Sequence, residues 1–223
     1  MLEWSAQRRF PRYLIQLSLL HREIAPAAVK AGVGWTRNLG EGGAGVDLAD
    51  ALRPGMPLRL RLQTDRGAIE VEARVIWIGE PTTPGGVVPH GMAFTQVASD
   101  QLQALRDLLL SKGEVRHAGV RLPLELSITC QCKGEMGLPL QGWTGDISRG
   151  GLLLRLPQVL PPGTALELTL HTPNEPIAVE GTIVWVEPPE RRSTGEPIGH
   201  GFRFIAFDGS LSMSLGLLLA EPL

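Results

Sequence analysis

Cysteine is scarce in this sequence, which limits the metal chemistry open to it. The 223 residues include 2 cysteines, Cys130 and Cys132, two positions apart in a strand-like run. Alternate residues of a strand face the same side, but a zinc site needs two further ligands at suitable spacing, and none lies nearby. We therefore expect two reduced thiols and no metal site.

Long apolar runs are also missing. No run approaches the roughly 18 residues that a membrane-spanning helix requires, so no membrane span is expected. The first residues, MLEWSAQRR, carry charges without an apolar stretch behind them and do not resemble a signal peptide. We therefore expect a cytoplasmic protein. Because hydrophobic residues still make up 43% of the chain, packed cores can form.

The chain has little net charge, but the charge is unevenly distributed. A net charge of −2 gives no overall attraction to DNA, RNA or anionic lipid, so none of these is an expected partner. Residues 1–40 nevertheless carry six cations against two anions, whereas residues 114–223 carry eight against twelve. The N-terminal region is therefore a basic segment at the start of the chain.

The sequence repeats itself. Four landmarks occur twice in the same order: 34–38 (GWTRN) and 142–146 (GWTGD), 54–55 and 162–163 (PG), 75–78 (VIWI) and 183–186 (IVWV), and 90–94 (HGMAF) and 200–204 (HGFRF). The first three pairs are offset by 108 residues and the fourth by 110, which a short loop insertion explains. The repeat indicates a duplication, with domains at 1–113 (the first copy) and 114–223 (the second copy).

Each copy has the pattern of short, half-buried strands. Apolar and polar residues alternate at 58–62 and 69–75, and again at 166–170 and 179–183. With 27 glycines and 18 prolines to form turns, this pattern predicts a mainly β protein with one small antiparallel barrel in each copy. The duplication also predicts similar surroundings for Trp35 and Trp143, and for Trp77 and Trp185.

A C-terminal helix is expected in each copy. The first should begin with Ser99 as its N-cap, end near Lys112 and bury one face. That face would consist of Leu102, Leu105, Leu108 and Leu109. In the second copy the corresponding apolar stripe would consist of Leu211, Leu215, Leu218 and Leu219.

No enzyme is expected. Residues 40–45 match GxGxxG, but the matching region of the second copy runs on into an apolar strand rather than a dinucleotide-binding helix. Ser148 is not in a GxSxG motif. His90 and His200 hold equivalent positions, which favours a shared structural turn over catalysis.

Two segments could form a binding site. Residues 38–43 read NxGxxG and residues 146–151 read DxSxxG, a pattern that a tight turn between strands could also explain. The segment 8–12 (RRFPR) precedes the first strand as an exposed basic arm, or as a solvated tail that binds nothing.

Together these motifs resemble a PilZ domain, the bacterial receptor module for cyclic di-GMP. The resemblance rests on an RxxxR arm, a [D/N]xSxxG motif, a Val-x-Trp strand and a Gly-x-x-Phe strand, and it covers nearly all of each copy. It implies that the arm wraps cyclic di-GMP onto the barrel surface, with no other cofactor. Guanidinium groups suit guanine and phosphate, and an amide, carboxylate or hydroxyl suits the Watson–Crick edge of guanine.

Neither copy carries the full motif. The candidate residues of the first copy are Arg8, Arg9, Arg12, Asn38, Gly40 and Gly43. The second, weaker candidate site consists of Arg116, Arg121, Asp146, Ser148 and Gly151. Gly40 replaces a serine in the first copy, and His117 replaces an arginine in the second. Because a hydrogen bond to a charged group contributes about 1.5–3 kcal/mol and a neutral one about 1, we favour the first copy.

The expected function is a non-enzymatic cyclic di-GMP receptor that changes shape or partner on binding, with an unidentified protein partner. The alternative is a degenerate PilZ-fold interaction module in motility, pilus or surface machinery that binds no nucleotide. Assembly into a homodimer is left open.

Overall fold

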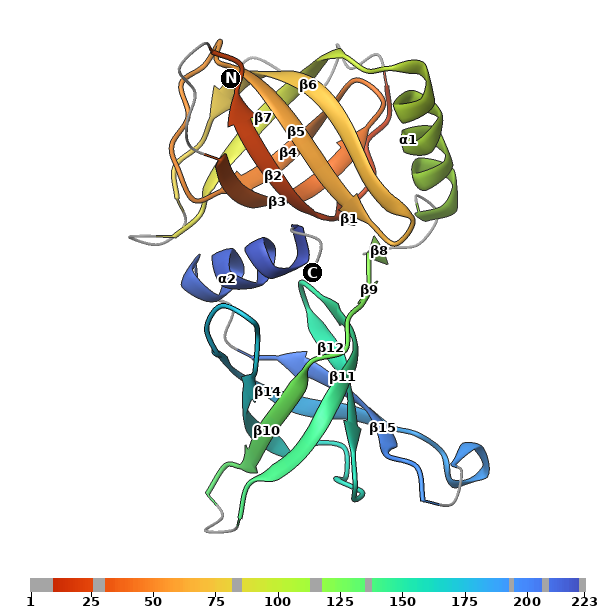
Figure 1. Cartoon of the computed structure of the whole chain (residues 1–223). Coiled ribbons are helices and arrows are strands. Elements are labelled where there is room, and N and C mark those ends of the chain that lie inside the picture. Colours follow the sequence, from red (N-terminus) through yellow and green to blue (C-terminus); the bar gives the residue numbers. More distant parts are fainter. Residues whose placement is uncertain are drawn as a thin grey trace. The chain divides into compact units, whose positions relative to one another are not determined.

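The protein consists of strands with two longer helices (Figure 1). The computed structural model describes residues 10–25, 31–81, 86–112, 118–134, 138–192, 195–205 and 209–220. The chain divides into two compact units, one of Met1–Val120 with Leu219–Leu223 and one of Arg121–Leu218.

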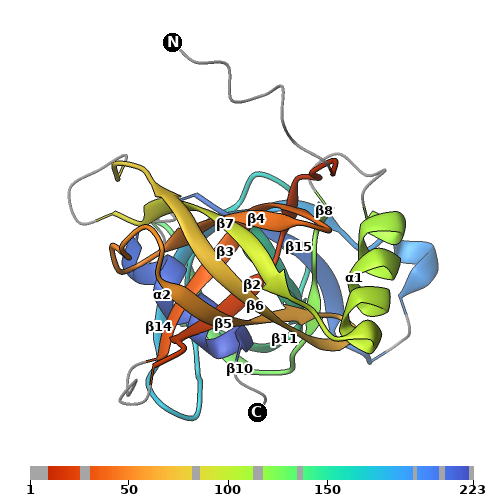
Figure 2. The ribbon, with the colours of Figure 1, turned by 90° about the horizontal axis from the view of Figure 1, so that it is seen from above.

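The first unit is a closed antiparallel barrel with the strand order β2-β3-β4-β7-β6-β5. Its strands are β2 (Ser18–Glu23), β3 (Ala31–Gly40), β4 (Gly43–Leu48), β5 (Pro57–Thr64), β6 (Gly67–Ile78) and β7 (Val88–Gln96). The short strands β1 (Ile15–Gln16) and β8 (Ala118–Gly119) form a separate parallel pair. Helix α1 (Ser99–Lys112) contacts β6 from outside the barrel (Figure 2).

The second unit repeats this barrel in the order β10-β13-β14-β15-β12-β11, which the β10–β11 pairing closes. Its strands are β10 (Ser127–Cys132), β11 (Leu140–Ser148), β12 (Gly151–Leu156), β13 (Ala165–Leu170), β14 (Ile177–Val186) and β15 (Ile198–Phe204). Strand β9 (Leu122–Pro123) adds to β11, the short helix η2 (Pro189–Arg191) precedes β15, and α2 (Gly209–Ala220) follows it. The predicted pair of antiparallel barrels, each followed by a helix, is confirmed.

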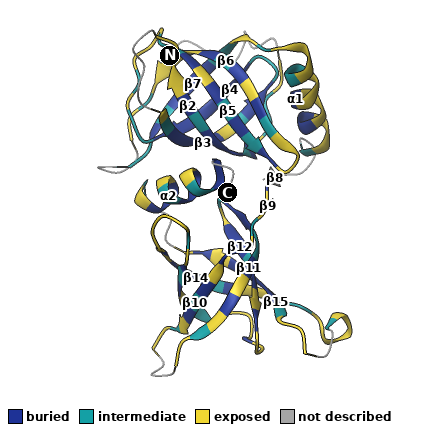
Figure 3. Ribbon diagram, in the orientation of Figure 1, coloured by how far each residue is buried: buried dark blue, intermediate teal, exposed yellow. Residues whose placement is uncertain are grey.

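The barrel cores contain the residues that the alternating pattern predicts (Figure 3). Leu58, Leu60 and Leu62 of β5 are fully buried, and so is the inward face of β13. In the helices, the buried leucines are Leu105, Leu108 and Leu109 of α1, and Leu211, Leu215 and Leu219 of α2. Ala98 rather than Ser99 caps α1, because its carbonyl accepts the first helical hydrogen bond, from Leu102 N–H.

A β-bulge at the same place in each copy sets the direction of the motif side chains. The β3–β4 register shifts between Thr36 and Asn38, and the β11–β12 register shifts between Thr144 and Asp146. A bulge adds one residue to its strand and re-aims the side chains beside it. Thr36 therefore points into the barrel, whereas Asn38 lies on the outer side.

The repeated Pro-Gly dipeptide forms the same turn in each copy. Gly55 has φ +88° and Gly163 has φ +93°, a region that glycine enters without the strain of a Cβ. In each turn the glycine N–H donates to the neighbouring long strand, to Val75 O at 2.7 Å and to Ile183 O at 2.8 Å. The duplicated sequence thus produces duplicated backbone geometry.

The predicted similarity of the tryptophans is confirmed for one pair and wrong for the other. Trp77 and Trp185 are 47% and 46% exposed, and each lies over a glycine of the next strand. Trp35 is 2% exposed and Trp143 is 46% exposed, although both occupy the same register position. Asp47, the register partner of Trp35, is buried too, so this outer face is covered in the first copy only.

The two repeated histidines each hold a loop through backbone hydrogen bonds. His90 is fully buried, and its Nε2 accepts a hydrogen bond from Leu52 N–H at 3.0 Å. Its Nδ1–H donates to Val88 O at 2.9 Å, so the ring is the neutral Nδ1–H tautomer. His200 makes the same two bonds, accepting from Leu160 N–H and donating to Ile198 O. Burial lowers the pKa of both histidines.

These histidines predict a fall in stability in mild acid. The pKa of each lies below 6.5 in the folded chain, so below about pH 6.5 the unfolded chain binds protons first. The contribution of these two histidines to the free energy of unfolding is therefore fully present above about pH 6.5 and declines as the pH falls towards their folded-state pKa. We expect a lower urea midpoint at pH 5.5 than at pH 7.5. The double variant His90→Gln/His200→Gln should be less stable at pH 7.5 but should lose less on acidification. Equal wild-type midpoints at the two pH values would contradict this assignment.

Candidate ligand-binding site

The segment after the basic arm is fixed to β3 by backbone and side-chain bonds. Tyr13 and Leu39 exchange two backbone hydrogen bonds of 2.9 Å. The buried Thr36 hydroxyl donates to Ile15 O at 2.6 Å and accepts from Leu17 N–H at 2.8 Å. Because both anchors lie within three residues of Asn38 along β3, they set the position of the chain just after Arg12.

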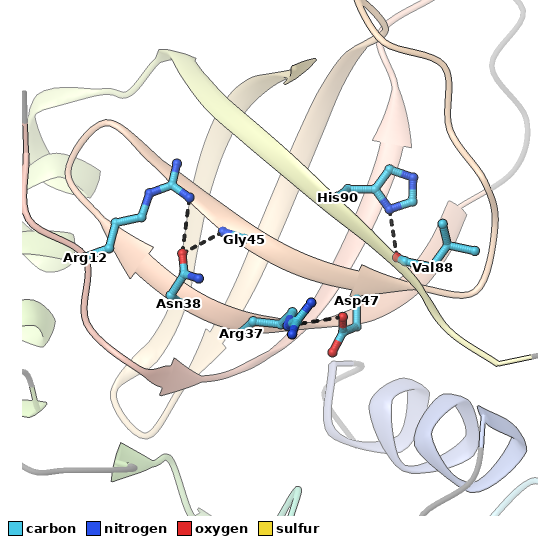
Figure 4. Close-up of polar contacts among 7 residues, drawn as sticks. All are labelled: Arg12, Arg37, Asn38, Gly45, Asp47, Val88 and His90. Atoms are coloured by element: carbon cyan, nitrogen blue, oxygen red, sulfur yellow. Dashed lines mark hydrogen bonds and ion pairs between the residues drawn. The ribbon is translucent and has the colours of Figure 1, made fainter. Parts of the chain in front are cut away.

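Arg12 and Asn38, which belong to separate sequence motifs, lie within hydrogen-bond distance of each other (Figure 4). The Arg12 guanidinium donates through Nη1 to Asn38 Oδ1 at 3.1 Å and through Nη2 to Met92 O at 3.4 Å. Asn38 Oδ1 also accepts from Gly45 N–H at 3.1 Å. The amide oxygen therefore fixes the guanidinium against the outer surface of β3 and β4.

The glycines of the motif allow close packing around this arginine. A Cβ on Gly40 would clash with the carbonyl oxygen of Pro11, and a Cβ on Gly43 would clash with that of Met92. A Cβ on Gly43 would also lie 3.1 Å from Arg12 Nη2. Gly40 and Gly43 thus bring the arm and β7 close to the turn between β3 and β4.

A cavity of about 320 Å³ lies between the arm, the turn that joins β3 to β4, and β7. It is lined by Phe10, Pro11, Arg12, Gly40, Gly42, Gly43 and Phe94. Arg12, Gly40 and Gly43 were named as site residues from the sequence, whereas Phe10, Pro11, Gly42 and Phe94 were missed. A signal existed for both aromatic residues, because Phe10 lies inside the RxxxR arm and Phe94 ends the Gly-x-x-Phe motif.

Ion pairs neutralise carboxylates near the cavity. Glu41, between the lining residues Gly40 and Gly42, pairs with Arg106 of α1 at 3.0 Å. Asp47 of β4 lies 3.7 Å from Nε of Arg37, the residue that precedes Asn38 on β3 (Figure 4). With these carboxylates paired, an anion bound beside Arg12 would meet less repulsion.

The second copy keeps the same pairing in an altered form. Arg121 forms an ion pair with Asp146 at 2.5 Å, in the place that Arg12 and Asn38 take in the first copy. Ser148 is 6% exposed, and its hydroxyl donates to Gly151 O at 3.0 Å. A Cβ on Gly151 would clash with the carbonyl of Phe202, so this glycine also allows close strand packing. These contacts are those of a tight turn.

The structure leaves some predicted residues without a description. Arg8, Arg9 and Arg116, with His117, lie outside the described residues.

Within the described part, no group of three or more potential ligands could hold a metal ion. None of the described helices is both long and apolar enough to cross a bilayer. Cys130 and Cys132 are free thiols, and burial raises the pKa of Cys130 to about 11.

Comparison with known proteins finds several similar solved structures, and no curated protein matches. The inhibitor of motility MotI/DgrA of Bacillus subtilis is 11% identical, with 91% of this chain and 95% of that chain covered and a TM-score of 0.37. The PilZ domain of Escherichia coli YcgR with c-di-GMP is 19% identical, with 47% and 90% covered and a TM-score of 0.40. The K. pneumonia MrkH–c-di-GMP complex is 14% identical, with 91% and 85% covered and a TM-score of 0.33.

A family model gives the assignment. The model for the PilZ domain matches residues 6–111 and again residues 115–220. The two matches cover nearly the whole chain and coincide with the two repeats that the sequence shows. The chain therefore belongs to the PilZ domain family and carries two PilZ domains in tandem.

Proposed function

We propose that this protein is a non-enzymatic receptor for cyclic di-GMP and that the first PilZ domain, residues 1–113, holds the ligand. The proposed ligand-binding residues are Arg8, Arg9, Arg12, Asn38, Gly40 and Gly43. The observation that carries the proposal is the Arg12 guanidinium, held by Asn38 at the edge of a cavity with a glycine-rich wall. Membership of the PilZ family supports the ligand class.

The chemistry of the site suits a cyclic diguanylate. A guanidinium presents donors in a planar fork that matches phosphate oxygens or the O6 and N7 atoms of guanine. The Asn38 side chain carries both an acceptor and donors, as the Watson–Crick edge of guanine requires. The cations of residues 1–40 would favour a ligand with two phosphates. Binding of the ligand to the basic arm would then change the surface that a partner protein meets.

For the second PilZ domain, residues 114–223, we propose that it serves as a module for interaction with a protein partner. Its candidate arginine, Arg121, is already neutralised by Asp146, and the Ser148 hydroxyl is used within the turn. A ligand at this site would meet an arginine whose charge is already offset by Asp146. Arg116, Arg121, Asp146, Ser148 and Gly151 therefore form the weaker of the two proposed sites.

Isothermal titration with two cyclic dinucleotides tests the proposal. We expect cyclic di-GMP to bind more tightly than cyclic di-AMP, because adenine lacks the O6 acceptor and places an amino donor there. One lost bidentate base contact corresponds to about 1–3 kcal/mol, or roughly 5- to 150-fold in affinity. Equal affinities would refute guanine recognition. Absence of binding by both would favour a PilZ-fold module that binds no nucleotide.

A further inference from the structure

Phe10 is the aromatic residue at the centre of the basic arm, and it belongs to the cavity wall. It lies two residues before Arg12 and is 39% exposed. A Cβ added to Gly42 would lie 2.8 Å from the Phe10 ring, so the glycine lets the ring rest on the turn between β3 and β4. Phe94 of β7 lines the same cavity.

The size of the cavity limits what it can hold. Its volume of about 320 Å³ is near the lower end of the roughly 300–1,000 Å³ typical of small-molecule pockets. A hollow of this volume can take one base with its sugar. The wall offers a guanidinium, an exposed aromatic ring and glycine backbone, which are the groups that hold a nucleotide by charge and by stacking.

We propose that Phe10 is the stacking platform for one guanine base of cyclic di-GMP. The inference rests on the proposed function and assigns a ligand-binding role to the aromatic residue that lies between the two arginines of the RxxxR arm. Arg12 lies on the same short segment, so a phosphate at the guanidinium and a base on the ring can belong to one nucleotide. Base stacking on an aromatic side chain contributes about 1–3 kcal/mol per base.

The competing explanation is purely structural. Phe10 could pack on Gly42 only to hold the arm in place, and any large apolar side chain would then serve. Leucine separates the two roles, because it keeps most of the apolar contact and removes the π-face. Tyr13 offers a matched control, since it is an aromatic residue on the same segment that does not line the cavity.

The experiment is titration of the full-length chain with cyclic di-GMP, with the guanine ultraviolet absorption band as a second readout. We expect Phe10→Leu to weaken binding at least fivefold and Phe10→Tyr to stay within twofold, with unchanged thermal midpoints. Stacking should lower the absorbance of the bound ligand in the wild type, and Phe10→Leu should reduce that effect at saturation. Tyr13→Leu should change the affinity by less than twofold.

Three results would overturn the inference, and they differ in what else they overturn. If the wild type binds and Phe10→Leu binds equally well, the stacking role fails while the receptor function stands. If Phe10→Leu weakens binding but leaves the absorbance change at saturation intact, the ring only positions the arm. If the wild type binds no cyclic dinucleotide, the proposed function fails together with the inference.

Discussion

Arg12→Ala is expected to weaken cyclic di-GMP binding at least tenfold. The substitution removes a guanidinium held by Asn38 Oδ1 at 3.1 Å and by Met92 O at 3.4 Å, at the edge of the candidate cavity. A hydrogen bond to a charged group contributes about 1.5–3 kcal/mol, and each 1.4 kcal/mol corresponds to a factor of ten in affinity. Arg8→Ala is expected to have an effect of the same size. Isothermal titration measures both.

Arg121→Ala is the control from the second copy. Its guanidinium already pairs with Asp146, so we expect the affinity to change less than threefold. If Arg121→Ala abolished binding while the two substitutions in the first copy left it intact, the site would belong to the second copy. If none of the three mattered, the chain would be better described as an interaction module with a PilZ fold.

Gly40→Ser should also weaken binding, by about tenfold, although it introduces the serine that the PilZ motif carries. A Cβ at this position clashes with the carbonyl oxygen of Pro11 and would lie 3.2 Å from Cγ of Arg12. The arm must move away to admit it, and Arg12 then loses its contact with Asn38. One added neutral hydrogen bond, worth about 1 kcal/mol, does not offset the displaced arginine.

Gly150→Ser is the matched control for Gly40→Ser. Gly150 lies in the corresponding turn of the second copy, and a Cβ there meets no heavy atom within 4 Å. The Gly150→Ser variant should keep an affinity for cyclic di-GMP and a thermal midpoint close to those of the wild type. Tighter binding by Gly40→Ser than by the wild type would show that the serine contacts the ligand and that the arm can move without loss.

The fold followed from patterns that are local in the sequence. Leu58, Leu60 and Leu62 alternate with polar residues, and the barrel buries all three. Repetition of the landmarks then predicted the second barrel from the first. Burial of the outer barrel face did not follow, because Trp35 and Trp143 occur in nearly the same local sequence. Their exposures differ because tertiary surroundings cover only one of them.

The candidate site was predictable where a motif that resembles the PilZ domain names the residue. Arg12 and Asn38 were assigned to one site from two such motifs, and the structure brings them within hydrogen-bond distance. Met92 O was not found, because barrel closure brings β7 beside β4 and no short pattern encodes that pairing. Phe94 was missed although it ends the Gly-x-x-Phe motif. Ser148 fits both a turn and a ligand motif in the sequence, and its bond to Gly151 O uses the hydroxyl within the turn.

Because of the bulge in β3, the site could be transferred to another protein only as a complete segment. Thr36 and Leu39 both point inward, and the two residues between them, one of which is Asn38, point outward. The direction of Asn38 therefore depends on all four residues together. If the same residues were laid into a strand without the bulge, strict alternation would turn Asn38 inward and Leu39 outward and exchange the two faces beyond that point. Anyone grafting this arginine-holding amide onto another small barrel must therefore transplant all four positions, and the host strand must accept the extra residue.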